Sequence, residues 1–442
     1  MIIIQWCISL AIALGLFLIS IFSIECVTAA LPQWRRRKRG DSTRPSVAVL
    51  IPAHNEQVGI KETLATVVPQ LQSGDQVLVV ADNCTDYTAK AARDAGAEVI
   101  ERSNQEKRGK GYALDFGVRT LEKGTHPDVV IVIDADCRVK ENTIDELARA
   151  AGRSNRPAQC INLLSPPSSP SPNHLVSAFA FRVKNWVRPL GLHRLGMPCL
   201  LSTGTAFPWK IIQTAPLASA NIVEDMQMGI DLTLAGHPPV FCPYAGITGV
   251  LPGQNSAVLT QRTRWEHGHM RTILTQVPRM FIRGIFTANI GALALACELA
   301  IPPLSLLVAF WFVLTFSVIG ECIGLRIIQP LEFMGIGWAL LIGALFLAWA
   351  RYGRDLLSLH VLLLIPVYVI HKMPLYKAFL GKRQQSWVRT ARDHESGPLL
   401  PAQLIVEKVV TSAGELGVHE DIDVPIAPST IRTGQGNLSA KK

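Results

Sequence analysis

Apolar residues run almost without a break through residues 1–31, where Glu25 is the first charged residue. A run of this length can cross a hydrocarbon core of about 30 Å. Five basic residues follow directly, at positions 35–39. An uncleaved membrane anchor is favoured over a cleaved signal peptide, because no basic region precedes the apolar run and the basic block comes after it. The positive-inside rule then places the following residues in the cytoplasm.

Between residue 46 and about residue 152, short apolar runs alternate with amphipathic stretches. Runs rich in β-branched residues predict buried strands at 47–51, 76–80, 98–100 and 129–133. Helical patterns lie at 56–68, 86–95, 111–121 and 142–151, the second with Thr85 as its N-cap. This alternation predicts an α/β fold, with helices on both faces of a parallel sheet. Ligands of such sheets bind beyond the carboxyl ends of the strands.

The second half of the chain is less regular and contains three more apolar segments. A turn-rich stretch at 165–172 predicts a surface loop, and the apolar segments follow at 284–319, 330–350 and 356–370. The last segment is short for a span. If each segment crossed once, the basic stretch that begins at Lys377 would lie outside, contrary to the charge rule. Either the last segment is interfacial or re-entrant, or the first crosses twice, and a cytoplasmic tail is favoured.

Length and composition agree with this division. Of the 442 residues, 49% are hydrophobic and 17% are charged, which excludes a disordered chain and argues against a wholly soluble one. The predicted parts are a transmembrane anchor (1–31), a basic linker (32–45), a globular domain (46–283), transmembrane or interfacial helices (284–376) and a basic, then flexible, cytoplasmic tail (377–442). The chain is expected in the cell inner or plasma membrane.

The charge of the chain limits its expected partners, and its cysteines limit the expected disulfide and metal sites. The net charge is +9, and the basic block behind the anchor predicts contact with membrane lipids and not with nucleic acid. Nine cysteines without C-x-x-C spacing predict neither a disulfide framework nor a zinc site.

Two carboxylates follow the fourth predicted strand. Asp134 and Asp136 are two residues apart, so their side chains point to the same face of an extended chain. Such a pair suits a hard divalent cation, Mg²⁺ or Mn²⁺, shared with the oxygens of a diphosphate. An isolated D-x-D is more often a pair of solvated turn aspartates, and the position at the end of a strand favours the metal site without settling it.

Other candidate residues are weaker when each is taken alone. Asp82 ends the second predicted strand, where it can also stabilise the following turn. The segment 107–111 joins two glycines to three cations, but it fits neither a P-loop nor a dinucleotide-binding fingerprint. Asp225 can simply cap a helix. Trp265 can anchor the chain at a membrane interface.

Taken in order, these segments resemble the membrane-bound family 2 glycosyltransferases, which include the cellulose, hyaluronan and poly-N-acetylglucosamine synthases. The resemblance rests on VLIPAHNE (49–56), ADNCTD (81–86), GKGYAL (109–114), the D-x-D, the pair Glu224 and Asp225, and the Q-x-x-R-W of 261–265. It extends from Val47 to Trp265, and the flanking membrane segments agree with it. Each motif is modest evidence, whereas their order and spacing together are specific.

The resemblance implies a GT-A fold, which is a Rossmann-like α/β domain with a mostly parallel sheet. It also implies inverting transfer from a nucleotide-diphosphate sugar, which is expected to be a UDP-sugar. The residues that it places at the nucleotide are Pro52, Ala53, Asn55, Glu56, Asp82, Lys110 and Asp134. Asp134 and Asp136 would hold Mg²⁺ or Mn²⁺, and Asp225 would be the general base with Glu224 beside it. The residues implied to close over the diphosphate and the acceptor are Gln261, Arg262, Arg264 and Trp265.

Departures from the family pattern leave the subfamily open. Val223 stands where many synthases have Thr, and ADNCTD stands where the DGSTD type is commoner. The expected activity is hexosyl or N-acetylhexosaminyl transfer to a polysaccharide or lipid-linked acceptor, with polysaccharide-assembly proteins as candidate partners. The alternatives are a transferase that adds a single sugar to a polyprenyl phosphate or lipid, a non-catalytic membrane subunit of a polysaccharide export complex, and a nucleotidyltransferase.

Overall fold

The computed structural model describes residues 2–32, 43–124, 126–219, 221–251, 255–325 and 329–381. The basic block at 35–39 and the predicted tail from residue 382 onward lie outside these ranges. The sheet, the helices that cover it and the apolar helices belong to one compact unit.

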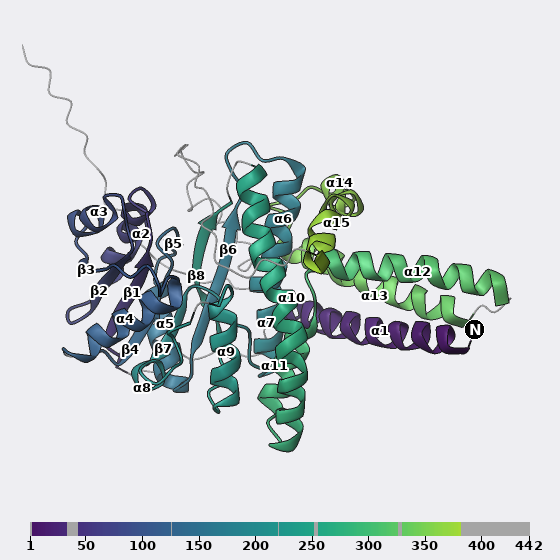
Figure 1. The fold of residues 1–442 in the computed structure, drawn as a ribbon, viewed down its shortest axis with the longest axis horizontal. Coiled ribbons are helices and arrows are strands. Elements are labelled where there is room, and N and C mark those ends of the chain that lie inside the picture. The colour runs from purple at the N-terminus through teal and green to yellow at the C-terminus, as the bar shows by residue number, and fades with distance from the viewer. Residues whose placement is uncertain are drawn as a thin grey trace, which may run out of the picture. The chain divides into compact units, whose positions relative to one another are not determined.

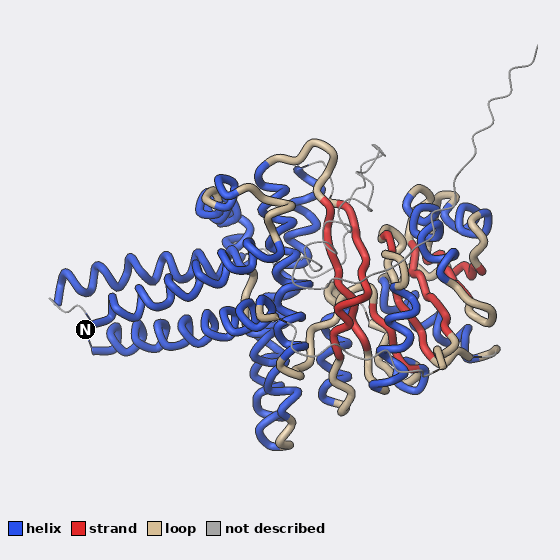
Figure 2. Tube along the Cα trace, turned by 180° about the vertical axis from the view of Figure 1, so that it is seen from behind, coloured by secondary structure: helices blue, strands red, loops and turns tan. Residues whose placement is uncertain are grey.

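An eight-stranded sheet carries the globular part of the chain (Figure 2), in the order β3-β2-β1-β4-β7-β6-β8-β5. The neighbours β3, β2, β1 and β4 run parallel, as do β6 and β8, whereas β7 and β5 run antiparallel to their neighbours. The expected mostly parallel α/β architecture is therefore confirmed. The strands are β1 (Val47–Ala53), β2 (Gln76–Asp82), β3 (Glu98–Arg102), β4 (Val129–Val132), β5 (Arg138–Val139), β6 (Ala158–Ser165), β7 (Thr205–Pro208) and β8 (Val240–Val250).

Helices cover both faces of the sheet, because the strands are apolar on both sides. In β1, Val49 packs into the core of one layer and Leu50 into the core of the other. The first layer contains α2 (Gly59–Val67), α3 (Thr88–Asp94) and α5 (Thr143–Ser154); the second contains α4 (Lys110–Glu122), α8 (Trp209–Ile212) and α9 (Glu224–Leu234). This arrangement leaves the carboxyl ends of β1, β2 and β4 to the loops that carry the candidate residues.

Two of the predicted helices begin later than the pattern indicates. α2 starts at Gly59 and α3 at Thr88, because the polar residues before them bind one another. The backbone N–H of Glu56 donates to Thr88 Oγ1 at 2.8 Å, and that of Thr88 donates to Asp86 Oδ1 at 3.0 Å. Thr85 is not the N-cap of α3. Its N–H donates to Asn55 Oδ1 at 2.7 Å and so joins the loop after β1 to the loop after β2.

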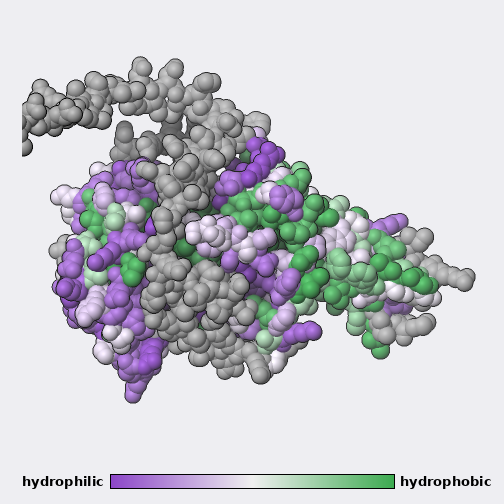
Figure 3. Space-filling model, turned by 90° about the horizontal axis from the view of Figure 1, so that it is seen from above, coloured by the Kyte–Doolittle hydropathy of each residue, from purple (hydrophilic) through white to green (hydrophobic). Residues whose placement is uncertain are grey.

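Three helices are long and apolar enough to cross a membrane. They are α1 (Ile2–Ala30), α12 (Leu304–Leu325) and α13 (Gln329–Tyr352), and Figure 1 shows them side by side, extending away from the sheet. Trp311 of α12 is fully buried among them, against Gly15 and Gly337. Figure 3 shows apolar side chains gathered over this bundle and polar ones over the sheet. These features agree with a membrane protein.

Four other helices lie where the bundle meets the globular part. They are α10 (Asn255–Phe286), α11 (Ile290–Ala300), α14 (Leu359–Leu362) and α15 (Ile365–Gly381). The predicted apolar segment 284–319 is broken at 301–303, so it supplies α11 and the candidate span α12. The segment 356–370 gives no helix of spanning length. Because α12 leaves the globular part and α13 returns, α15 and the sheet lie at the same end of the bundle (Figure 1).

A helical stretch after β6 joins the sheet to α1. It consists of α6 (Pro172–Arg182), a π-helical turn η2 (Val183–Val187) and α7 (Arg188–Arg194). Gly191 lies so close to α1 that an added Cβ would stand 2.0 Å from the carbonyl oxygen of Glu25. Arg188 Nε donates to Glu25 Oε2 at 2.5 Å, and both side chains are buried. α1 is therefore packed against the globular part and is not a loose extension of it.

Candidate functional site

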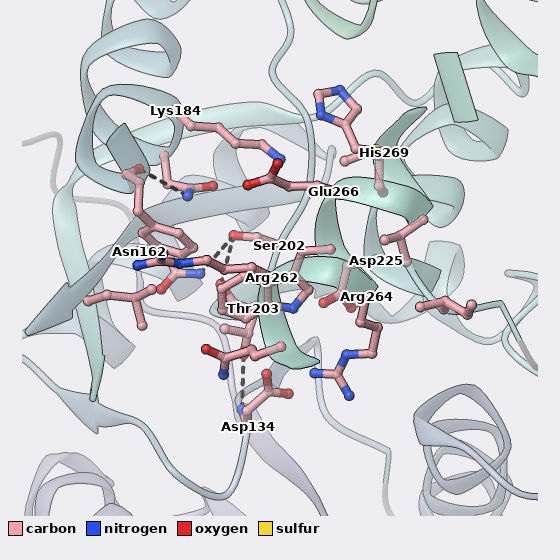
Figure 4. Close-up of a pocket in the computed structure, with 18 of the residues that line it drawn as sticks. Asp134, Asn162, Lys184, Ser202, Thr203, Asp225, Arg262, Arg264, Glu266 and His269 are labelled. Atoms are coloured by element: carbon pink, nitrogen blue, oxygen red, sulfur yellow. Dashed lines mark hydrogen bonds between the residues drawn. The ribbon is translucent and has the colours of Figure 1, made fainter. Parts of the chain in front are cut away.

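A cavity of about 460 Å³ begins at the carboxyl ends of β1, β2 and β4 and reaches the first residues of α12. It brings together residues that are far apart in the sequence, as Figure 4 shows for Asp134, Asp225 and Arg264. The predicted site residues that line it are Pro52, Ala53, Glu56, Asp82, Lys110, Asp134, Asp136, Glu224, Asp225, Gln261, Arg262, Arg264 and Trp265.

Asn55 is the one predicted site residue that is absent from the cavity lining. It has a left-handed backbone, with φ of 54°, and its side-chain nitrogen donates to Thr85 Oγ1 at 3.1 Å. In the structure Asn55 therefore joins two loops at the edge of the sheet. Its contact with a nucleotide stays a prediction.

Asp82 ends β2 and is held by a cation from the neighbouring strand. Arg102 Nη1 donates to Asp82 Oδ1 at 2.5 Å, and Arg102 Nη2 donates to the carbonyl oxygen of Lys107 at 2.7 Å. Arg102 pairs with Asp82 in the strand register, so its side chain is directed to this acid. The sequence analysis missed Arg102. Its position at the end of a predicted strand, beside the basic segment 107–111, was the available signal.

Lys110 joins the acids of two separate motifs. Its ammonium Nζ lies 2.8 Å from Asp134 Oδ1, 2.8 Å from Asp225 Oδ2 and 3.7 Å from Glu224 Oε1. It is the first residue of α4, after Gly109, whose φ of 123° favours glycine. The D-x-D and the Glu-Asp pair thus meet at one cation, although about ninety residues separate them.

The close contact of α4 with the segment before α9 holds Lys110 near Glu224 and Asp225. An added Cβ on Gly111 would stand 2.4 Å from the carbonyl oxygen of Leu217 and 2.7 Å from that of Ser219. Because these are backbone atoms, a larger residue cannot be accommodated by a side-chain rotation. The glycine that follows Lys110 therefore sets how near Glu224 and Asp225 come to the sheet edge.

Burial and mutual repulsion change the protonation of these groups. Burial raises the pKa of Asp134, with further raising by Asp225 and Asp136 against the lowering effect of Lys110. Burial and the neighbouring Asp225 raise the pKa of Glu224 to about 7. Burial alone would lower the pKa of Lys110, but Asp134, Asp225 and Glu224 raise it well above its usual value. Lys110 is therefore a permanent cation, and two of its neighbours, Asp134 and Glu224, have raised pKa values.

Asp134 and Asp136 are suited to a hard divalent cation, since both offer carboxylate oxygens at the cavity wall. Among the described residues no group of three or more His, Cys, Asp or Glu is placed to hold a metal by itself. A cation here would take further oxygens from a bound phosphate, as Mg²⁺ does in many phosphate sites. The donor set fits such a group, with Lys110 as a competing cation on Asp134.

The Q-x-x-R-W segment lies on α10 and closes the cavity opposite the sheet edge. Figure 4 shows Arg264 beside Asp225. The Arg262 guanidinium lies 5.7 Å from the ring centroid of Tyr368, and the Trp265 ring lies 5.7 Å from that of Phe181. These contacts tie the motif to α15 and to α6. The polar motif therefore stands between the sheet and the apolar helices.

Polar residues at the membrane end of the cavity were not predicted. Glu266 follows the motif and forms an ion pair with Lys372 of α15. Lys184, Arg188 and Glu298 also line this end. A charged residue inside an otherwise apolar segment was the signal for Glu298 and Lys372.

Comparison with known proteins identifies the family of this chain. Residues 45–268, about half of the chain, match the family described as "Glycosyltransferase like family 2". The chain belongs to this family. The family-level prediction is therefore confirmed, and the synthase subtype stays a prediction. Relatives matched in sequence include the probable glycosyltransferase YdaM of Bacillus subtilis (strain 168), 24% identical over 279 residues, which are 57% of this chain and 61% of YdaM.

Two further matches of this glycosyltransferase chain are a second relative in sequence and a solved structure. A 4,4'-diaponeurosporenoate glycosyltransferase of Staphylococcus haemolyticus (strain JCSC1435) is 29% identical over 26% of this chain and 31% of its own length. The chain thus spans less than two thirds of either relative. Among solved structures, the mannosyltransferase PcManGT from Pyrobaculum calidifontis, in complex with GDP-Man and Mn²⁺, covers 79% of this chain and 99% of its own, with a TM-score of 0.49 and 16% identity.

Proposed function

We propose that this chain is a membrane-integral glycosyltransferase that moves a sugar from a nucleotide-diphosphate donor, expected to be a UDP-sugar, to an oxygen of a polysaccharide or lipid-linked acceptor. The observation that carries the proposal is the single cavity that joins Asp82, Asp134, Asp136 and Asp225 to the Q-x-x-R-W segment. These acids come from separate motifs. If each were only a helix cap or a turn residue, the four would not be expected to line one cavity.

The sheet edge is the donor end of the proposed site. Asp82, with Pro52, Ala53 and Glu56, would bind the nucleoside, and Asp134 and Asp136 would hold a divalent cation against the diphosphate. When bound, Mg²⁺ or Mn²⁺ would neutralise charge on the leaving group. Arg264, beside Asp225 in Figure 4, would supply a further positive charge on that side.

Asp225 would act on the acceptor. As the acceptor oxygen attacks the anomeric carbon, the bond to the diphosphate breaks, its electron pair leaves with the diphosphate, and the acceptor proton moves to Asp225. Attack from the side opposite the leaving group inverts the anomeric centre. Lys110 would keep the Asp225 carboxylate directed into the cavity, since the two lie 2.8 Å apart. Glu224, with a pKa of about 7, would also be able to hold a proton beside Asp225.

One alternative is favoured by a specific observation. The cavity extends to Phe22 of α1 and Leu304 of α12, both on candidate membrane spans. An apolar acceptor could therefore reach it, which favours transfer of a single sugar to a lipid, and one relative is named a 4,4'-diaponeurosporenoate glycosyltransferase.

The decisive experiment offers a panel of sugar nucleotides to the purified full chain in lipid nanodiscs, with Mg²⁺ or Mn²⁺. We expect release of nucleoside diphosphate, and loss of that release when EDTA removes the metal. Release of pyrophosphate from nucleoside triphosphates would instead identify a nucleotidyltransferase. Donor binding without any release, in the presence of candidate acceptors, would contradict catalysis and support the non-catalytic subunit.

A further inference from the structure

Lys184 is a partly buried cation that the proposed transfer reaction does not use. It lies on η2, the π-helical turn between α6 and α7, and lines the membrane end of the cavity. π-Helical turns are rare and occur frequently at functional sites. Figure 4 shows the Lys184 side chain extending across the cavity toward Glu266. Within the described ranges, no residue forms a hydrogen bond or ion pair with its ammonium.

The acids around Lys184 already have partners. Glu266 is paired with Lys372. Glu298 Oε2 accepts the backbone N–H of Leu200 at 3.0 Å, and Glu25 is paired with Arg188. Burial and the charge of Arg188 lower the pKa of Lys184 to about 8, so most of this side chain is still charged at pH 7. A buried ammonium without a close partner is unfavourable, and an incoming anion would remove that penalty.

Part of the wall at this end of the cavity is apolar and continuous with the candidate membrane helices. Phe22 comes from α1, Ile301 and Pro303 come from the break before α12, and Leu304 is the first residue of α12. α1 and α12 are both long and apolar enough to cross a bilayer. A molecule that fills this end of the cavity must therefore present a hydrocarbon surface to the wall and a negative charge to Lys184.

We infer that Lys184 binds the anionic head group, a phosphate or carboxylate, of a membrane-lipid acceptor whose apolar chain lies against Phe22 and Leu304. The inference rests on the proposed function, which places the donor at the other end of the same cavity. Lys184 is then a specificity residue for the acceptor, because it selects lipids with a negative head group and holds that head between the bilayer and Asp225. Its role is separate from donor binding, which uses the sheet edge.

Direct binding measurements on the full chain in detergent micelles test this inference. The probes are a polyprenyl monophosphate, the uncharged polyprenol of the same length, inorganic phosphate and UDP. We expect Lys184→Met to weaken binding of the polyprenyl monophosphate about tenfold or more, the usual size of a lost charged hydrogen bond. Binding of polyprenol and UDP should not change. Lys184→Arg should retain most of the affinity, and Lys140→Met, which removes a half-buried lysine outside the cavity, should behave as the wild type.

Three results would overturn the inference. The first is equal binding of the polyprenyl monophosphate by Lys184→Met and the wild type. The second is equal loss of both lipids in Lys184→Met, which would indicate a packing role. The third is binding of inorganic phosphate as tight as that of the polyprenyl monophosphate, which would exclude an apolar chain from the site. Failure of UDP and of every other nucleoside diphosphate to bind the wild type would count instead against the proposed function.

Discussion

Lys110 lies 2.8 Å from both Asp134 and Asp225, two acids assigned to opposite ends of the proposed reaction. The motif order in the sequence was enough to select these residues. It could not show that one lysine bridges them, because the bridge depends on the packing of α4 against the segment before α9. Asn55 shows the reverse case, since its motif position suggests a nucleotide contact while its side chain binds Thr85.

Replacing Lys110 by Met should strengthen metal binding while reducing turnover. Lys110 and a cation on Asp134 repel each other, so its removal should lower the Mn²⁺ concentration for half-maximal donor binding, on the order of tenfold. Turnover should fall because Asp225 loses its partner. Titrating Mn²⁺ in a donor-binding assay measures the first effect. A higher or unchanged Mn²⁺ requirement, compared with a Lys140→Met control, would contradict the competition between Lys110 and the metal.

Gly111→Ala should lower both turnover and thermal stability. The new methyl group would press on the backbone of Leu217 and Ser219 and push the segment that leads to Asp225 away from the sheet edge. Gly124→Ala is the matched control, since nothing lies within 4 Å of its added Cβ. Turnover and melting temperature of the two variants give the comparison. If Gly111→Ala melts and turns over like Gly124→Ala, the close backbone contact is not essential.

At the scale of elements, the sequence predicted β1, β2, β3 and β4 and missed the other four strands, including the two longest, β6 and β8, which lie in the less regular half of the chain. β1, β2 and β4 are continuous apolar runs because both of their faces are buried, and such runs are visible without a structure. β5 has two residues and β7 has four, so neither shows a period. α10 was also missed. It carries polar motif residues on the cavity side and contains Pro278, so no simple helical pattern marks its 32 residues.

Gly337→Leu should disrupt the packing of the apolar helices. An added Cβ on Gly337 would stand 2.1 Å from the buried Trp311 ring, whereas nothing lies within 4 Å of one on Gly343 in the same helix. The expected outcome is a lower melting temperature in nanodiscs for Gly337→Leu alone, with UDP binding retained below that temperature. Identical melting of Gly337→Leu and Gly343→Leu would show that the observed contact of α12 with α13 is not present in the membrane.

At the scale of the whole molecule, the three candidate spans place the sheet and α15 on one side of the bilayer. Single cysteines in a cysteine-free background test this topology. A membrane-impermeant maleimide should label Gly124→Cys and Gly381→Cys from the same side, and Gly324→Cys, at the far end of α12, from the other. Opposite labelling of positions 124 and 381 would require an additional crossing, as when the apolar segments 284–319, 330–350 and 356–370 each span once.

The proposed catalytic centre requires that Asp225 act on the acceptor and not on the donor. The most direct test compares Asp225→Asn with Asp231→Asn, an acid on the same helix that binds Gln227. For Asp225→Asn we predict a fall in turnover of about 10²-fold to 10⁴-fold, as expected for a lost general base, with nucleotide affinity within about twofold of the wild type. Asp231→Asn should keep normal turnover. Wild-type turnover in Asp225→Asn, or a parallel loss of nucleotide binding, would contradict the account.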